Sequence, residues 1–312
     1  MRLITSSLFL AHVTPPGHPE RAERAAVFEE VARTWRDRGA HSAEPRPASR
    51  DELLRVHSAQ HIDALAATAG RDGQMIDSDT FTSPDSYEVA RLAAGAALQA
   101  AVHALETGET AIALVRPPGH HAERNTAMGF CLFNNVAVAA AEAIARGVPR
   151  VAIVDIDVHH GNGTQSMFYA DPRVLYVSTH QSPYYPGTGA ADETGAGVGT
   201  GFTLNVPLAA GAGDVEYRRA YESICGRLRE YDPGLLLVSA GFDAHADDPL
   251  ASMRVTVGGF AEIVRMLFSA VSCPTAFVTE GGYDLDALGA SLDAVLDVVR
   301  ETETPTIDGS GR

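Results

Sequence analysis

The sequence predicts one α/β domain with a central, mostly parallel sheet that carries helices on both faces. Three observations predict this class. From residue 110 onward, short strand-like runs alternate with segments of helical periodicity. These runs are apolar at almost every position, which is typical of parallel strands covered on both faces. The chain has 312 residues, of which 45% are hydrophobic, and it can therefore bury one large core.

The predicted elements follow in a regular order. Continuous apolar runs predict strands at 110–115, 151–156, 174–179, 202–208, 235–240 and 275–280. Apolar periodicity between them predicts helices at 134–147, 164–169, 214–231, 258–271 and 284–300. Residues before 105 are expected to be mainly helical, after an opening strand within 3–9. We assign residues 1–300 to the domain and expect 301–312 to form a flexible tail.

Composition excludes several classes of protein. The formal net charge is −16, and all 24 basic residues are arginines that form no basic run. Because a nucleic-acid-binding surface needs clustered positive charge, we expect no nucleic-acid partner. No segment reaches the ~20 apolar residues of a membrane span, and the opening apolar patch is too short for a signal peptide. The three cysteines lack a C-x-x-C spacing, which argues against a disulfide framework, so we expect a cytoplasmic protein.

Costly polar side chains stand directly after the predicted strands. The stretch VAIVDIDVHHGNGT, residues 151–164, runs from a buried strand into two aspartates and two histidines. Ligand sites of parallel α/β sheets form just beyond the carboxyl ends of the strands. The loops after four of the predicted strands should therefore converge. They carry His120, His121, Asp155, Asp157, His159, His160, Asp243, His245, Glu280 and Tyr283.

Asp157 and His159 are the first candidates for metal binding. Residues two apart in an extended segment point to the same side, so this carboxylate and this imidazole can bind one ion. Asp243, directly after LLLVSAGF, supplies a third ligand, and a fourth position stays open for water, as in catalytic zinc sites. Any one of these residues alone is better explained as a loop cap or a packed core residue. Their combination predicts a zinc site.

The adjacent His120 and His121 follow Pro-Pro-Gly, which favours the tight turn that lets both imidazoles face a cleft. A buried histidine needs a partner that sets its tautomer. Asp155 and Asn162 are available across the cleft. An imidazole beside a carboxylate becomes more basic, whereas the pKa of one beside a neutral amide stays closer to its ordinary value. Two histidines with different partners would therefore suit different roles in proton transfer.

Eight motifs occur in one order along the chain, and the ordered set is specific although each motif alone is not. They are HPERAER, RPPGHHA, MGFCLFNN, DIDVHHGNGT, STHQSPYYPGTG, LNVPL, SAGFDAHADDPL and TEGGYDL. On these motifs the chain resembles the zinc-dependent histone deacetylase and acetylpolyamine amidohydrolase family, over roughly residues 12–290. The resemblance implies the arginase-like α/β fold and an amide hydrolase. Asn162 stands where class I deacetylases usually have aspartate, which resembles the class II branch.

The resemblance implies a role for each catalytic candidate. The zinc ligands are matched by Asp157, His159 and Asp243. His121, with Asn162 as its partner, matches the histidine that activates water and later protonates the leaving amine. His120, paired with Asp155, matches an electrostatic neighbour of that histidine. Tyr283 matches the tyrosine that hydrogen-bonds the substrate carbonyl opposite zinc.

The resemblance also implies a narrow acyl-lysine tunnel. Phe130 and Tyr185 match its two aromatic walls, and Gly129 matches another wall position. Asp79 falls where some members hold the substrate backbone, although a plain helix-start aspartate is an equally good interpretation. Leu250 stands where polyamine-preferring relatives can carry an acidic residue, which favours acyl-lysine in peptides or proteins as the substrate.

Family members bind potassium behind the zinc. One such site is matched by Asp155, Asp157, His159, Ser178 and Thr179. An outer site is matched by Phe168, Asp171, Val174 and Phe202. His160 and His245 are expected to pack around the ligands rather than to bind metal.

Three other functions share parts of this pattern. An acetylpolyamine or other small-amide deacetylase would use the same site. The string DAHAD, residues 243–247, resembles arginase-type enzymes with two manganese ions, but His160 and Asn162 occupy the further carboxylate positions, which favours one metal. A non-catalytic protein that binds acylated amines would be expected to lose a zinc ligand or the tyrosine, and this chain retains them all.

Overall fold

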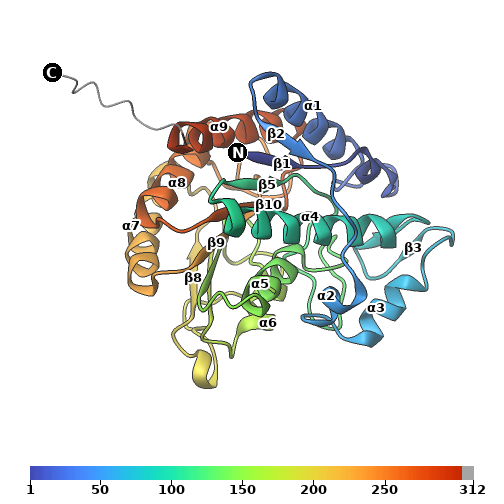
Figure 1. Ribbon diagram of the computed structural model, residues 1–312, viewed down its shortest axis with the longest axis horizontal. Helices are drawn as coiled ribbons and strands as arrows, with labels where there is room; N and C mark the ends of the chain where they lie inside the picture. The colour runs from blue at the N-terminus through green and yellow to red at the C-terminus, as the bar shows by residue number, and fades with distance from the viewer. Residues whose placement is uncertain (304–312) are drawn as a thin grey trace.

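A single eight-stranded sheet organises the molecule, for which the computed structural model describes residues 1–303 (Figure 1). From one edge to the other, its strands are β2 (His41–Ala43), β1 (Arg2–Ile4), β5 (Ala111–Ala113), β10 (Thr275–Thr279), β9 (Leu235–Ala240), β6 (Val151–Asp155), β7 (Val174–Gln181) and β8 (Thr203–Leu208). Every neighbouring pair in this sheet is parallel. The predicted parallel sheet is therefore confirmed.

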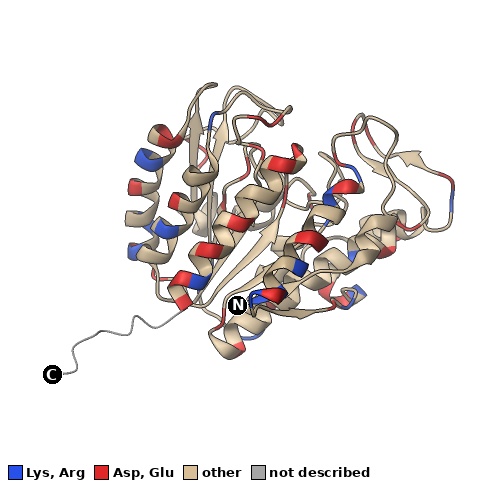
Figure 2. Ribbon diagram, turned by 90° about the horizontal axis from the view of Figure 1, so that it is seen from above, with Lys and Arg blue, Asp and Glu red and all other residues tan. Residues whose placement is uncertain are grey.

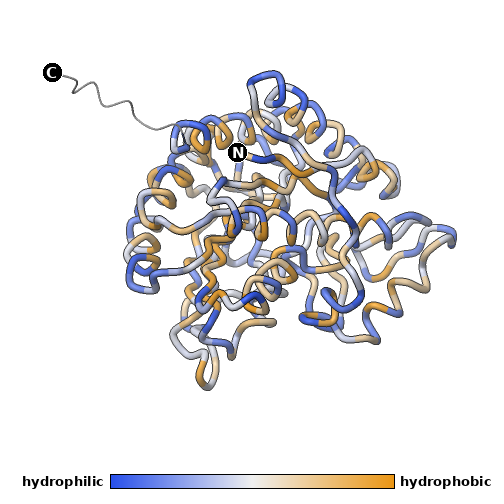
Figure 3. The backbone as a smooth tube through the Cα atoms, viewed as in Figure 1, coloured by the Kyte–Doolittle hydropathy of each residue, from blue (hydrophilic) through white to orange (hydrophobic). Residues whose placement is uncertain are grey.

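Helices cover both faces of the sheet (Figure 1). One face carries α1 (Glu23–Asp37), α7 (Asp214–Tyr231), α8 (Val257–Ala270) and α9 (Leu285–Glu303), and the other carries α4 (Ser86–Thr107) and α5 (Asn135–Ala145). Side chains alternate between the two cores along each strand, as the period of two requires. Val154 and Val238 pack toward the first group of helices, and Ile153 and Leu237 toward the second. Figure 3 shows the central strands as largely hydrophobic.

The opening of the chain differs from the prediction. The first strand ends at Ile4 instead of continuing through residue 9. A 3-10 helix, η1 (Ser7–Ala11), follows, because the Ser6 hydroxyl accepts a hydrogen bond from the Leu8 backbone amide and caps it. The helical content expected before residue 105 comes from α1, α4 and two short helices. The short ones are α2 (Arg50–Leu54) and α3 (Ala59–Ala66).

Other elements also differ from the prediction. The antiparallel hairpin formed by β3 (Gln74–Met75) and β4 (Phe81–Thr82) is absent from it, because two-residue strands leave too short a pattern to recognise. The short helix α6 (Asn162–Phe168) begins two residues before the predicted 164. Helix α9 continues to Glu303, so residues 301–303 of the predicted tail are helical. The remainder of that tail, 304–312, lies outside the described residues.

The strand order brings the polar loops to one edge. β5, β10, β9 and β6 are consecutive neighbours in the sheet. They precede, respectively, the loops that begin at residues 114, 280, 241 and 156, and these carry the polar motifs. Because all four strands are parallel, these loops leave the sheet at the same edge. The convergence expected from the sequence is therefore confirmed by the topology.

Charged residues lie mostly on the outer helices and loops, where Figure 2 shows both signs interspersed. Within residues 1–303, no helix is long and apolar enough to cross a membrane.

The fully buried His57 makes folding stability depend on pH. Its Nδ1 lies 3.0 Å from the Glu123 carbonyl oxygen, and its Nε2 accepts a hydrogen bond from the Asn134 backbone amide at 2.9 Å. This arrangement holds the neutral tautomer with the proton on Nδ1. Burial, reinforced by the nearby His61, lowers the pKa of His57 from 6.5 to about 3.

We expect this histidine to destabilise the fold as pH falls from 6.5 toward 3. In that window the unfolded chain binds a proton that the folded chain refuses, so stability rises with pH by up to about 1.4 kcal/mol per pH unit. Urea unfolding of the wild type and of His57→Gln between pH 5.5 and 4.5 measures the effect. The wild type should lose stability more steeply, whereas above pH 7.5 the two slopes should agree. Equal slopes in the acidic window would contradict the assignment.

Candidate active site

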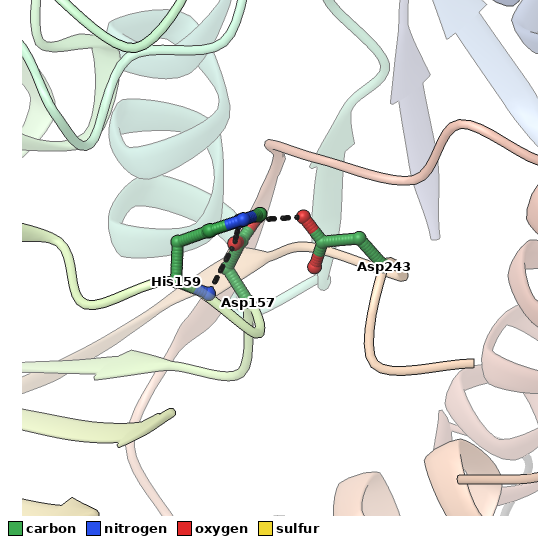
Figure 4. A group of neighbouring side chains, drawn as sticks. All are labelled: Asp157, His159 and Asp243. Carbon is green, nitrogen blue, oxygen red and sulfur yellow. Dashed lines mark hydrogen bonds and ion pairs between the residues drawn. The ribbon is translucent and has the colours of Figure 1, made fainter. Parts of the chain in front are cut away.

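Asp157, His159 and Asp243 meet at the carboxyl edge of the sheet (Figure 4). The first two come from the loop after β6, and Asp243 comes from the loop after β9. One ligand atom from each lies within 4.8 Å of the others. The Nδ1 atom of His159 is 3.2 Å from Asp157 Oδ1 and 3.1 Å from Asp243 Oδ2. All three side chains are buried, so the group is built into the core of the site.

Backbone amides orient both carboxylates. The amide of Gly281 donates to Asp157 Oδ2 at 2.8 Å, and that of Val158 donates to Asp243 Oδ1 at 2.8 Å. Gly281 can approach this closely because it lacks a side chain; a Cβ there would clash with Asp243 Oδ2. The loop after β10 therefore helps to orient Asp157 and packs closely against Asp243.

The electrostatics of this group favour a bound cation. Burial, together with repulsion from Asp157, raises the pKa of Asp243 to about 7. Two buried carboxylates side by side are costly unless a positive charge compensates them. Two carboxylate oxygens and one imidazole nitrogen, with room for a fourth ligand, are the donors of a catalytic metal site. These three residues could hold a metal ion.

The two adjacent histidines have different partners, as the resemblance implies. His120 Nδ1 lies 3.0 Å from Asp155 Oδ2, which also accepts a hydrogen bond from the Tyr176 hydroxyl at 3.1 Å. His121 Nδ1 lies 2.8 Å from Asn162 Oδ1. Both imidazoles are buried, and their ring centroids are 4.0 Å apart.

The two histidines therefore differ strongly in basicity. Burial alone would lower the pKa of His120, but the carboxylates of Asp157 and Asp155 outweigh burial and raise it to about 10. His121 lacks such a partner. Burial and the positive charges of His120 and His159 lower the pKa of His121 well below 6.5, so the expectation that it stays near its ordinary value is corrected. The neutral ring donates from Nδ1 to Asn162 and keeps the Nε2 lone pair.

Tyr283 is held in place by a backbone hydrogen bond and by contacts to its ring. Its amide donates to Asp248 Oδ2 at 2.7 Å. The Arg24 guanidinium lies over its ring, 5.0 Å from the centroid, and the Phe130 ring meets it edge-on at 5.7 Å. Burial raises the pKa of the Tyr283 hydroxyl well above 10, so the phenol is a hydrogen-bond donor at neutral pH.

The two aromatic residues predicted to line a tunnel, Phe130 and Tyr185, contact Tyr283 and His121, respectively. Gly129 and Phe130 both adopt positive φ, at 56° and 68°, and a Cβ at Gly129 would clash with the His121 ring. This turn places the Phe130 ring beside Tyr283. The Tyr185 ring meets His121 edge-on at 5.2 Å. The structure therefore puts Phe130 and Tyr185 against opposite members of the catalytic set.

Tyr184 is a site residue that the sequence did not single out. Its ring stacks on His159 with centroids 5.7 Å apart, and its hydroxyl donates to the carbonyl oxygen of Leu250. This hydrogen bond connects the loop that contains Leu250 to the loop that contains Tyr184 and Tyr185. The doubled tyrosine in SPYYPG was the available clue.

Asp79 lies in the turn between β3 and β4, next to Gly129 and not at the start of a helix. Its Oδ1 accepts hydrogen bonds from the Gly129 amide at 3.1 Å and from the Thr80 hydroxyl at 2.8 Å. The Thr80 hydroxyl oxygen in turn accepts from the Phe130 amide at 3.1 Å. The unpredicted hairpin thus braces the strained Gly129-Phe130 turn.

A buried ion-pair network behind the site was also missed. Arg24 donates from Nε to the Gly282 carbonyl at 2.7 Å and pairs with Glu20 at 3.1 Å. Arg116 binds both carboxylate oxygens of Glu20, at 2.8 and 2.7 Å. All three charged side chains are fully buried. HPERAER and RPPGHHA contain them, but only contacts across the fold show that they support the segment before Tyr283.

The residues matched to potassium sites lie beneath this edge. Ser178 Oγ is 2.9 Å from His180 Nδ1, and Thr179 Oγ1 is 3.2 Å from the Tyr221 hydroxyl. The outer set, Phe168, Asp171, Val174 and Phe202, lies around the end of α6 and the starts of β7 and β8. His160 contacts Thr188 and Gln165. His245 accepts a hydrogen bond from the Asp247 amide.

The fold and this site define a class: an α/β protein with a histidine pair and a buried group that could hold a metal ion, both at one sheet edge. Comparison with known proteins narrows it. A model of the histone deacetylase domain matches residues 18–299. A probable deacetylase of Methanothermobacter thermautotrophicus is 45% identical over 280 residues, which are 88% of this chain and 83% of that protein. An uncharacterised Synechocystis protein is 44% identical, over 93% of this chain and 96% of its own length.

A plant relative and a solved structure also match the chain. Histone deacetylase 15 of Arabidopsis thaliana is 39% identical over 96% of this chain and 55% of that protein. The crystal structure of the HDA15 HD domain superposes with a TM-score of 0.92, at 37% identity, covering 96% of this chain and 91% of that one. The chain belongs to the histone deacetylase family, has its arginase/deacetylase fold and is a deacetylase-type hydrolase.

Proposed function

We propose that the protein is a zinc-dependent amidohydrolase that removes acetyl or other short acyl groups from the ε-amine of acyl-lysine in peptides or proteins. The observation that carries this proposal is the arrangement of a neutral His121 and a protonated Tyr283 around the Asp157, His159 and Asp243 group. A relative named a probable deacetylase supports the reaction class.

The residues divide the work of amide hydrolysis. Zinc held by the three ligands would supply Lewis acidity and lower the pKa of a water molecule toward about 7. His121 accepts the proton of that water at Nε2 and returns it to the departing amine. His120 stays protonated and offsets negative charge. Tyr283 donates its hydroxyl proton in a hydrogen bond to the acyl oxygen as negative charge develops there.

The rim supports a peptide substrate. Phe130 and Tyr185 would enclose the apolar stem of a long amine and exclude water. A groove of about 650 Å³ opens beside Tyr283 and is lined partly by Val13, Pro249 and Leu250. Its lining also includes His18, Arg21 and Glu23, so the groove offers both apolar and polar contacts to the residues that flank an acyl-lysine. An acetylpolyamine or other small amide remains the second candidate because it would need the same catalytic groups.

Potassium is proposed as a structural ion at the two family positions. The inner position would use Asp155, Asp157, His159, Ser178 and Thr179, and the outer one Phe168, Asp171, Val174 and Phe202.

The test is amine release from an acetyl-lysine peptide, acetylputrescine and acetylspermidine, measured side by side. We expect the zinc-loaded protein to prefer the peptide and a chelator to abolish turnover. Tyr283→Phe should lower kcat by about 10²–10³-fold, the usual cost of removing one oxyanion donor. Tyr87→Phe is the control, because this tyrosine on α4 contacts Phe133 and Arg91, neither of which belongs to the catalytic, tunnel or potassium sets, and it should keep wild-type kcat.

Preference for either polyamine would refute the peptide assignment and leave the mechanism intact. Two metal ions per chain would instead favour the binuclear manganese alternative. Binding of acylated amines without any turnover would favour a non-catalytic role.

A further inference from the structure

Glu280 is a buried carboxylate that has no role in the mechanism above. It follows β10, and its side chain is fully buried. Its Oε2 accepts hydrogen bonds from the backbone amides of Gly119 at 2.6 Å and His120 at 3.2 Å. Its Oε1 accepts one from the Ser239 hydroxyl at 3.1 Å. A buried carboxylate is costly, so three well-placed donors indicate a specific task.

The partners of Glu280 come from different segments of the active site. Its side chain binds the turn that carries the two histidines and the end of β9, and its own backbone begins the Glu280–Tyr283 segment. Arg24 donates to the Glu280 backbone carbonyl and also binds Gly282. Within residues 1–303, no arginine side chain bonds the Glu280 carboxylate itself. The group therefore acts as an acceptor for neutral donors.

These bonds hold the backbone from which the two histidine rings project. The two amides bound by Glu280 belong to the residues immediately before His121, so they set the direction of the chain that enters it. From this turn, His120 must reach Asp155 at 3.0 Å while His121 must reach Asn162 at 2.8 Å. Glu280 is three residues from Tyr283 along the chain, and its carboxylate also binds the backbone turn that carries the two histidines.

We propose that Glu280 is a positioning residue that ties the Gly119-His120 turn to the segment carrying Tyr283, so that His121 and Tyr283 address one substrate together. The expected effect of Glu280 on catalysis rests on the proposed function. The hydrogen bonds on which it depends can be tested without any substrate.

Two substitutions separate geometry from charge. Glu280→Ala removes all three acceptors, and we expect kcat to fall by about 10- to 100-fold with KM within about twofold, because small misplacements of catalytic groups have costs of this size. Glu280→Gln keeps an oxygen for both amides, and its amide group can donate to the Ser239 hydroxyl oxygen. It should therefore retain kcat within about threefold. Metal content per chain should equal that of the wild type in both variants.

Glu142→Ala is the matched control. This largely buried carboxylate on α5 pairs with Arg55 and Arg146, far from the catalytic groups. Its loss should lower the thermal unfolding midpoint as the loss of Glu280 does, but should leave kcat unchanged. A kcat in Glu280→Ala no lower than in this control would overturn the proposal. A Glu280→Gln variant as impaired as Glu280→Ala would also overturn it, since charge would then matter rather than position.

Hydrogen exchange provides the substrate-free measurement. In Glu280→Ala the amides of Gly119 and His120 should exchange faster than in the wild type, and in Glu280→Gln they should stay protected. Unchanged protection in Glu280→Ala would refute the positioning role. If the wild type deacetylated none of the substrates while this exchange pattern held, the proposed function would fail and the positioning of the turn would stand.

Discussion

Replacing His121 with alanine should lower kcat/KM for the acetyl-lysine peptide by about 10²–10⁴-fold, the range typical of a general acid–base residue. We assign this role to His121 rather than to His120 because the two rings differ in basicity. Asp155 and Asp157 keep His120 protonated, whereas His121 lies against a neutral amide and remains free to accept a proton. Steady-state kinetics at neutral pH measures the effect.

His61→Gln is a matched control, because His61 is another buried histidine, on α3, that contacts a backbone carbonyl at 2.9 Å. We expect it to leave kcat/KM within about threefold of the wild type. His61 contacts Leu132, His57 and Phe133, which are not catalytic residues, so its loss should act mainly on folding stability. If His121→Ala retained activity comparable to that of His61→Gln, the proton-transfer role would belong to another group.

Replacing Asp243 with asparagine should remove the bound metal and abolish turnover. The carboxylate is one of the three candidate ligands, and even outer supporting residues typically contribute 10–100-fold to metal affinity. Without metal, by contrast, the substitution should raise the stability of the folded protein or leave it unchanged. Burial and repulsion from Asp157 raise the pKa of Asp243, which means that its charged form is unfavourable in the empty fold. A neutral side chain of the same size relieves this repulsion.

The thermal unfolding midpoint should therefore reverse its order with metal. Without zinc, Asp243→Asn should unfold at a temperature equal to or above that of the wild type at pH 8. With excess zinc, the wild type should become the more stable protein, because the ion binds its folded state. Asp247→Asn, whose side chain is 76% exposed, should follow the wild type in metal content and midpoint. Full metal occupancy in Asp243→Asn would show that this residue is not a ligand.

Local patterns were sufficient to predict much of the sheet and the composition of the site. VAIVDI and LLLVSA are apolar at nearly every position, and in a parallel sheet such runs end where polar loops begin. Asp157 and His159 lie two residues apart, which predicts a common direction on an extended segment, but the structure places both in the bend after β6, so their convergence depends on the conformation of that loop. The hairpin at residues 74–82 could not be predicted in this way, because its strands are too short for a period to develop.

Other properties depend on contacts between residues far apart in the chain. Glu280 binds Gly119 across 161 positions and Arg24 binds Gly282 across 258, and neither pairing leaves a local pattern in the sequence. The pKa of His121 is a second case. Its partner is a neutral amide, as expected, but burial and two neighbouring imidazoles lower that pKa well below its ordinary value.

The sequence by itself determined the kind of fold, and it predicted a candidate metal-binding group and two unlike histidines. These follow from side-chain types and spacings, which act over a few residues. The tertiary structure decided which histidine stays neutral, which aromatic rings face each other and which buried charges hold the Tyr283 segment. Burial and through-space electrostatics determine those properties, and both depend on neighbours that only the folded chain brings together.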